Sequence, residues 1–159
     1  MTNSIFMPKR RGVILELFEK HIKNTKEKEI VALECVYICR LTYTVFRILG
    51  FEDSKVHLNT KVLKHLYDKK PAEEFDFIVR NLHKIIKYPD RIYKNKTSKR
   101  GDYCLVKKIE DFSYLCSVEF TEDGEEMKII VVTAFRVRDE AYLKKYELLW
   151  SWKGGNPSS

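Results

Sequence analysis

Cysteine and histidine, the residues that most often hold metal ions, are scarce in this sequence of 159 residues. The four cysteines, Cys35, Cys39, Cys104 and Cys116, lie in apolar segments rather than in loops. They lack the paired close spacing of a zinc site, and no histidine is near enough in sequence to complete one. We therefore expect reduced core cysteines, no bound metal and no cofactor.

The sequence also lacks an export signal and an uninterrupted membrane-spanning run. A short apolar patch at residues 5–7 precedes three basic residues, which is the wrong order for a signal peptide. The apolar run 30–49 approaches membrane-spanning length, but Glu34, Arg40 and Arg47 would each be costly in hydrocarbon. We therefore expect a soluble, cytoplasmic protein that does not enter a membrane.

No phosphate-binding loop, dinucleotide-binding fingerprint or nucleophile elbow is present. Hydrophobic residues make up 44% of the chain, enough for a packed core, and the net charge is +7. Residues 57–110 carry 14 Lys and Arg against 7 Asp and Glu, whereas residues 111–159 carry 6 against 9. A positive field concentrated in the middle of the chain attracts polyanions such as nucleic acid.

Apolar residues at helical spacing dominate the first half of the chain. The run 30–49 is predicted to be a buried helix because it has no internal turn signal and ends at Gly50, although its β-branched and aromatic residues also suit strands. Asn59 or Thr60 is expected to cap a short helix, and Pro71 to precede a longer one. The predicted helices are 12–24, 30–49, 60–69 and 71–89.

Beyond residue 90 the apolar period changes to two, as half-buried strands require. Residues 112–120 alternate perfectly, residues 122–124 supply a hairpin turn, and Asp139 can cap a last helix through Trp150. The predicted strands are 92–95, 103–110, 112–120 and 128–138. We therefore predict an α+β fold in which N-terminal helices are followed by a four-stranded antiparallel meander sheet and a C-terminal helix.

Residues 53–55 resemble a boundary between two parts of the chain. Residues 1–55 are predicted to form a helical N-terminal extension and residues 56–153 the main domain. Residues 154–159 are predicted to form a disordered tail.

His65 is the first residue that could carry chemistry. It lies at the edge of the apolar stripe of its helix, about sixty degrees from Val62, so that packing can hold the ring while its nitrogens stay accessible. Histidine commonly serves as a general acid or base near neutral pH. The same position also suits an ordinary histidine at the border of the core.

A second group of candidates is basic or hydroxylated. The stretch from Lys87 to Arg100 holds cations that could line one rim of the sheet or form a solvated loop; alternation places Arg91 and Tyr93 on one face. Thr133 is expected in phase with Ile129, Val131 and Phe135, and the arginines 136 and 138 on the opposite face. Thr133 is either a core threonine or a site residue, and an arginine on a sheet face can clamp a phosphate.

Four short motifs follow one another between residues 56 and 150: Val56-His57-Leu58, Lys64-His65, Lys87-Tyr88-Pro89-Asp90-Arg91-Ile92-Tyr93 and Val131-Val132-Thr133-Ala134-Phe135-Arg136. In this order they resemble the barnase–EndoU–colicin–RelE superfamily of small nucleases, particularly its phage-associated branch. The resemblance implies a fold of helices followed by a four-stranded sheet. It covers about three-fifths of the chain and leaves the first 55 residues unmatched.

The resemblance also implies metal-independent RNA cleavage, in which the ribose 2′-hydroxyl attacks the adjacent phosphate and leaves a cyclic phosphate and a free 5′-hydroxyl. His65 would be the general acid or base and Thr133 a hydroxyl contacting phosphate. Arg91 or Lys94, with Arg136, would stabilise the transition state. The expected substrate-binding residues are His57, Tyr93, Lys94, Lys99 and Arg138.

RNA is the expected partner under this hypothesis. The protein would be a toxin or mobile-element effector, with an inhibitory or immunity protein as a further partner. One alternative is a non-catalytic RNA-binding module of the same fold, which would bind RNA in a salt-dependent manner without cutting it. Another is a protein-interaction domain with negligible affinity for RNA.

Overall fold

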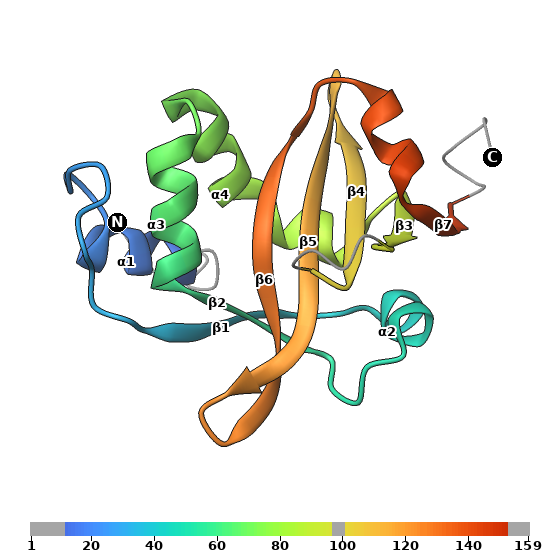
Figure 1. Cartoon of the computed structure of the whole chain (residues 1–159), viewed down its shortest axis with the longest axis horizontal. Helices are drawn as coiled ribbons and strands as arrows, with labels where there is room; N and C mark the ends of the chain where they lie inside the picture. The colour runs from blue at the N-terminus through green and yellow to red at the C-terminus, as the bar shows by residue number, and fades with distance from the viewer. Residues whose placement is uncertain (1–11, 97–100, 153–159) are drawn as a thin grey trace, which may run out of the picture.

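The fold is known from a computed structural model that describes residues 12–96 and 101–152. Lys99, one of the expected substrate-binding residues, and the expected tail 154–159 lie outside these residues. Figure 1 shows one strongly twisted sheet at the centre of the molecule, with helices around it. No helix within the described ranges is long and apolar enough to cross a membrane.

The described ranges contain the helices α1 (Gly12–His21), α2 (Tyr43–Leu49), α3 (Thr60–Lys69) and α4 (Ala72–Lys87), and the 3₁₀ helix η2 (Glu140–Lys145). Asn59 caps α3 as predicted, because its side-chain oxygen accepts the N–H of Val62 at 2.9 Å. Asp139 caps η2 in the same way, accepting the N–H of Ala141 at 3.0 Å. These local signals were readable in the sequence because each cap lies within three residues of the group it binds.

The strands are β1 (Cys35–Arg40), β2 (Lys55–Asn59), β3 (Arg91–Lys94), β4 (Tyr103–Ile109), β5 (Phe112–Asp123), β6 (Glu126–Val137) and β7 (Glu147–Ser151). They form one sheet in the order β1-β2-β6-β5-β4-β3-β7. All neighbouring strands are antiparallel except β2 and β6, which run parallel.

The predicted fold class is therefore wrong: the sheet is mixed and has seven strands, not four. The expected meander is present as β3 to β6, but β1 and β2 extend it at one edge and β7 at the other.

Two predicted helices are also wrong in part. The run 30–49 is not one helix; it forms β1 and then α2, and Gly50 ends α2 with a left-handed φ of 71°. The expected C-terminal helix stops at Lys145. Pairing with strands distant in sequence overrides local helix signals in both places.

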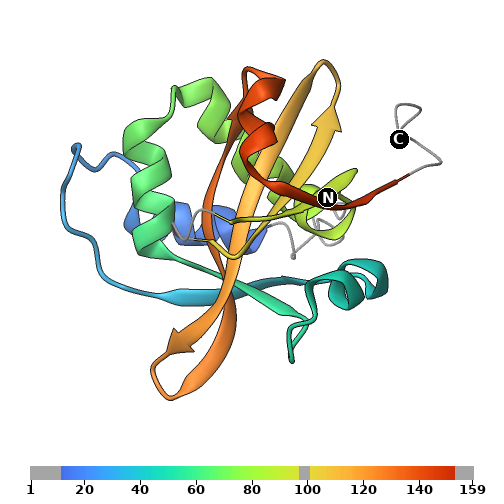
Figure 2. The ribbon, with the colours of Figure 1, turned by 45° about the vertical axis from the view of Figure 1, so that its right-hand side comes forward.

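The two faces of the sheet have different neighbours. The helix-covered face carries Val56, Cys116 and Ile129, which share one core with residues of α1, α3 and α4. The opposite face, here called the open face, is covered at one end by η2, whose Leu143 packs with buried residues of β3 to β6. Figure 1 shows α4 behind the strands, and Figure 2 shows η2 in front of them.

A bulge in β6 changes which residues reach the open face. Val131 is opposite Val118, but Thr133 is opposite Ser117, so Val132 is an extra residue in the ladder. Val131 and Ala134 consequently both belong to the helix-covered core. Thr133 lies on the open face with Phe135, as expected, but not with Ile129 and Val131, because strict alternation fails across the bulge.

Gly101 should be a sensitive position in the sheet. Its φ is +92°, and an added Cβ would lie 2.9 Å from the Ser117 side chain. Gly101→Ala should lower the free energy of unfolding by roughly 2–4 kcal/mol, measured by urea denaturation, because backbone strain and overpacking add. Gly124→Ala is the control, because φ is also positive there, at +70°, but an added Cβ would meet no atom within 4 Å. This substitution should lower the free energy of unfolding by only about 1 kcal/mol. Equal losses would contradict the crowding at Gly101.

Candidate functional site

The contacts of Tyr67 show which side of α3 carries His65. Tyr67 packs against Phe18 of α1 and Phe75 of α4, with ring centroids 5.6 and 5.4 Å away, so it points into the helical layer. His65 is two residues earlier, about 200° around the helix, and therefore lies on the opposite side. His65 is exposed. It consequently points away from α1 and α4, toward the side of the open face.

Two lysines share this side of α3. Lys61 and Lys69 stand four residues before and after His65, so the three form one stripe with about 6 Å between successive Cβ atoms. All three are exposed, and among the described residues none has a carboxylate within 4 Å. The buried cation of the same helix, Lys64, is instead bound to Asp68 at 2.6 Å. Lys61 and Lys69 are thus two positive charges without an ion-pair partner among the described residues, whereas His65 interacts electrostatically with the Asp68 carboxylate.

The stripe lies beside β6. Lys70, which ends α3, places its Nζ 5.2 Å from the ring centroid of Phe135. Figures 1 and 2 show α3 and β6 rising together from the end of the sheet where β2 lies. Five residues of helix before Lys70 span about 7.5 Å, and two residues of strand before Phe135 span about 6.6 Å. His65 and Thr133 are therefore at the same level.

Thr133 has an unusual neighbour on the adjacent strand. Ser117, directly opposite it in β5, is only 4% exposed, and its Oγ has no hydrogen-bond partner among the described residues. A buried hydroxyl without a partner costs roughly 1–3 kcal/mol, and Gly101 lies close to this one, since a Cβ added there would be 2.9 Å from Ser117 Oγ. We call Lys61, His65, Lys69, Lys70, Ser117 and Thr133 together the α3–β6 site.

Arg91 and Tyr93 share the open face, as alternation predicts, but at a distance from Thr133. Three strand spacings separate Tyr93 from Thr133, about 14 Å. Arg91 Nη1 donates to the Tyr93 hydroxyl at 3.1 Å and to Glu140 of η2 at 3.0 Å. The hydrogen bond from Arg91 lowers the pKa of Glu140. Arg91 thus already has an anionic partner, and it fastens η2 to the sheet.

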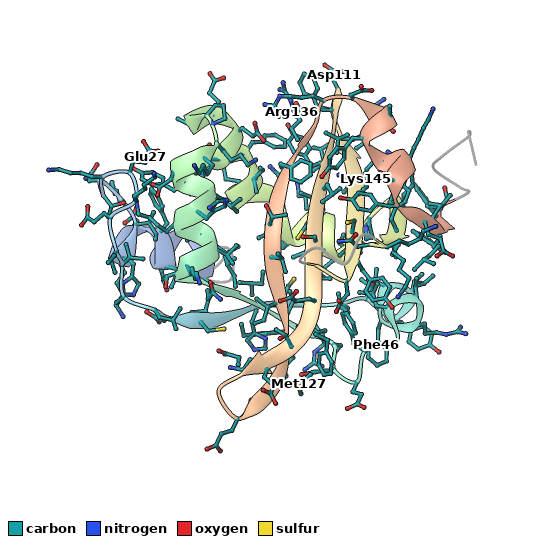
Figure 3. All side chains as sticks on the ribbon, viewed as in Figure 1. Glu27, Phe46, Asp111, Met127, Arg136 and Lys145 are labelled. Atoms are coloured by element: carbon teal, nitrogen blue, oxygen red, sulfur yellow. The ribbon has the colours of Figure 1, made fainter. Side chains whose placement is uncertain are left out.

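Arg136 and Arg138 lie on the helix-covered face, away from Thr133. The Arg136 guanidinium stacks on Phe112, with Cζ 4.1 Å from the ring centroid. Arg138 Nη2 donates to Glu74 Oε1 of α4 at 2.6 Å, and the backbone N–H of Arg136 donates to Glu74 Oε2 at 3.0 Å. Figure 3 places Arg136 beside Asp111, at the far end of the sheet from Met127. Both arginines hold α4 against β6.

The remaining expected binding residues are dispersed. His57 lies on the open face, on β2, with its ring 6.1 Å from Tyr37, and both burial and the charge of Lys128 lower the pKa of His57. Its Nδ1 is buried without a partner among the described residues. Lys94 is exposed, with Nζ 5.2 Å from the ring centroid of Tyr103. Its strand position places Lys94 on the face opposite Tyr93 and Thr133.

The cysteines do not offer a nucleophile. Burial raises the pKa of the Cys35 thiol, and the nearby Asp123 carboxylate raises it further. Burial also raises the pKa of Cys39 to about 12 and that of Cys104 to about 11. A thiol must ionise to attack. Within residues 12–96 and 101–152, no three His, Cys, Asp or Glu residues are grouped so that they could hold a metal ion.

The structure therefore places His65 and Thr133 at about the same level on two neighbouring elements, α3 and β6. Arg91 is instead paired with Glu140, and Arg136 lies on the other face of the sheet. The structure adds Lys61 and Lys69, which the sequence reasoning missed although their spacing of four residues from His65 was visible. It also adds Ser117, for which the sequence held no signal, because its position depends on the pairing of β5 with β6.

Comparison with known proteins does not identify this chain. No protein-family model matches it, and no significant match exists among curated proteins or solved structures.

The ion pair of Glu74 with Arg138 should make stability depend on pH. Burial would raise the pKa of Glu74, but the hydrogen bonds from Arg138 and Arg136 outweigh burial and lower it below the ordinary 4.5. The pair should therefore stabilise the fold fully above about pH 4.5 and less as the pH falls through the folded pKa. Glu74→Gln should cost roughly 1–3 kcal/mol at pH 7, and urea denaturation should show this difference shrinking toward pH 3.

Asp76→Asn on the same helix is the matched control. Asp76 pairs with Arg80, and their side chains are 58% and 56% exposed. Such surface pairs contribute roughly 0–1 kcal/mol, so this variant should change stability little. A Glu74→Gln effect of equal size at pH 7 and pH 3 would rule out the ionic origin of the stabilisation.

Proposed function

We propose that this protein is a metal-independent endoribonuclease that cleaves RNA at the α3–β6 site. The observation that supports this function best is the position of His65. It is an exposed histidine between two unneutralised lysines, level with a threonine hydroxyl on the same side of the molecule. A proton acceptor, phosphate-binding cations and a hydroxyl donor are the groups that cleavage without a metal ion needs.

The reaction balances with the groups at this site. His65 removes the proton of a ribose 2′-hydroxyl, and the 2′-oxygen attacks the adjacent phosphorus. The bond from phosphorus to the 5′-oxygen breaks, and that oxygen takes a proton from water. The hydroxide that remains is neutralised by the proton that His65 took from the 2′-hydroxyl, so that His65 is regenerated. The products are a 2′,3′-cyclic phosphate and a 5′-hydroxyl, with no oxidant, reductant or metal ion consumed.

The other side chains of the site would stabilise the charge that develops on the phosphate. Lys61 and Lys69 lie one turn on either side of His65, so they can contact the phosphate at the cleaved bond or its neighbours. The Thr133 hydroxyl would donate to a nonbridging oxygen, which gains charge in the transition state. Arg91 and Arg136 enter this proposal only as residues that hold η2 and α4 in place.

RNA in the cytoplasm is the substrate that this proposal implies. If the protein acts as a toxin or mobile-element effector, an inhibitory protein covering the α3–β6 site is part of the same proposal. A non-catalytic RNA-binding module is the second candidate. The pairing of Arg91 with Glu140 and of Arg138 with Glu74 favours it, because these arginines then lack free charge for catalysis.

A cleavage assay tests the enzyme. The full chain, incubated in EDTA with a fluorescein-labelled single-stranded RNA, should yield fragments that end in a cyclic phosphate. His65→Gln should reduce the cleavage rate roughly 10²–10⁴-fold, the usual contribution of a positioned proton acceptor. Thr133→Val should reduce it roughly tenfold or more by removing one donor to the transition state.

His21→Gln is the histidine control. His21 lies in α1 and contacts Glu34 at 2.7 Å, outside the α3–β6 site, so its rate should stay within about twofold of the unmodified protein. Intact RNA after long incubation would exclude the enzyme, and RNA bound but uncut would favour the binding module. Cleavage undiminished by His65→Gln would place the chemistry elsewhere.

A further inference from the structure

A second surface with the chemistry of nucleic-acid binding lies where α2 meets the end of α4. The Thr42 hydroxyl donates to the backbone carbonyl of Lys87 at 3.1 Å. This bond fixes the start of α2 against the end of α4, although 45 residues separate the two. Figure 3 marks α2 by its label at Phe46, at the end of the sheet away from Arg136.

A tyrosine follows each partner of this hydrogen bond. Tyr43 comes directly after Thr42 and is 72% exposed, and Tyr88 comes directly after Lys87 and is 56% exposed. Most of each ring is in water, so neither contributes much to the core. The hydrogen bond places the backbones of these two tyrosines near each other, and an exposed aromatic ring is a surface on which a base could stack.

Cations accompany both rings. Arg47 Cζ lies 5.7 Å from the ring centroid of Tyr43, and Lys87 Nζ lies 5.8 Å from that of Tyr88. Lys84, one turn before Lys87 on α4, is exposed as well. Burial and the charges of Lys84 and Lys87 lower the pKa of His83, which is consistent with a positive potential here. We call Tyr43, Arg47, Lys84, Lys87 and Tyr88 the α2–α4 patch.

Arg47, Lys84 and Lys87 differ from nearby cations in having no carboxylate as an ion-pair partner. On α4, Arg80 is paired with Asp76, and on β4, Lys107 lies 3.8 Å from Asp90. Among the described residues, no carboxylate lies within 4 Å of Arg47, Lys84 or Lys87. The fold thus leaves three positive charges without a carboxylate partner around two exposed rings, and the contacts of Arg47 and Lys87 with these rings contribute only about 0.5–1 kcal/mol each at an exposed site.

We propose that the α2–α4 patch binds a single-stranded stretch of RNA, with bases on Tyr43 and Tyr88 and phosphates on Arg47, Lys84 and Lys87. Interleaved rings and cations suit a single strand, because its bases are free to stack while its phosphates remain within reach. A duplex hides its bases, so it would use only the cations. The inference takes the identity of its partner from the proposed function, but it concerns binding away from the α3–β6 site.

Fluorescence anisotropy with a labelled 12-nucleotide single-stranded RNA tests this patch in the full chain. Tyr43→Ala with Tyr88→Ala should weaken binding at least tenfold, because each stacked base contributes roughly 1–3 kcal/mol. Arg47→Gln with Lys87→Gln should also weaken binding. It should reduce the slope of log affinity against log salt by about 1.4, since each phosphate contact on a single strand contributes about 0.7.

Lys23→Gln with Lys26→Gln is the matched control, removing two exposed charges from the segment after α1; its affinity should stay within about threefold. The patch would be refuted if the tyrosine variant bound normally, if the control lost as much affinity as the arginine and lysine variant, or if an RNA duplex bound equally well. Retained binding without any cleavage would instead contradict only the proposed enzyme, so the two failures are distinguishable.

Discussion

The short parallel pairing of β2 with β6 determines where the α3–β6 site can lie. Only two positions pair, Val56 with Ile129 and His57 with Ile130, before the chain leaves the sheet at Asn59 and begins α3. Because β2 runs parallel to β6 and pairs only with its first part, the chain leaves β2 near the start of β6, and α3 then follows β6 toward its other end. The rest of β6 has no strand on that side, and α3 packs beside it instead. This pairing therefore places α3, with His65, beside β6, with Thr133.

The distribution of carboxylates separates structural cations from available ones. Arg91, Arg138 and Lys64 each bind a carboxylate within 3.0 Å, and in each case the pair joins elements or closes a helix against its surroundings. Of the three pairs, Lys64 with Asp68 is buried on both sides, with side chains 7% and 8% exposed; removing one partner of such a pair leaves an uncompensated charge, which costs roughly 3–5 kcal/mol. A cation held in an ion pair can bind a ligand only if that pair breaks. Exposed lysines without a partner carry no such cost; they include Lys61 and Lys69 on α3 and Lys84 on α4.

How far the sequence predicts this molecule depends on how local each signal is. Asn59, Pro71 and the apolar stripe of α4 act within one or two turns, and those helices were predicted with nearly correct ends. The alternation of β5 is equally local. By contrast, β1 and β7 depend on partners far along the chain, so their segments were predicted as helix.

The same distinction applies to the site. His65 was identified from its place on one helix, and Thr133 from a hydroxyl in an apolar strand. The bulge at Val132 arises from the register between β5 and β6, so strict alternation misplaced Thr133 relative to Val131. Arg91 and Arg136 were expected at the site from the family resemblance, and the sequence could not reveal their actual surroundings. Glu140, which binds the Arg91 side chain, is 49 residues from it, and Glu74, which accepts the backbone N–H of Arg136, is 62 residues away.

The positive charge of residues 57–110 is not one continuous rim. Lysines lie around His65 on α3 and at the end of α4, with the acidic first turn of α4 between them along the chain, and further exposed lysines, Lys94 and Lys108, lie on β3 and β4. Two separate basic surfaces suit a flexible polyanion better than a compact one, because a chain held at one surface has a raised effective concentration at the other. A strand held at the α2–α4 patch would therefore visit the α3–β6 site more often without any new contact there. If both proposals hold, the α2–α4 patch would bind the RNA and the α3–β6 site would cleave it.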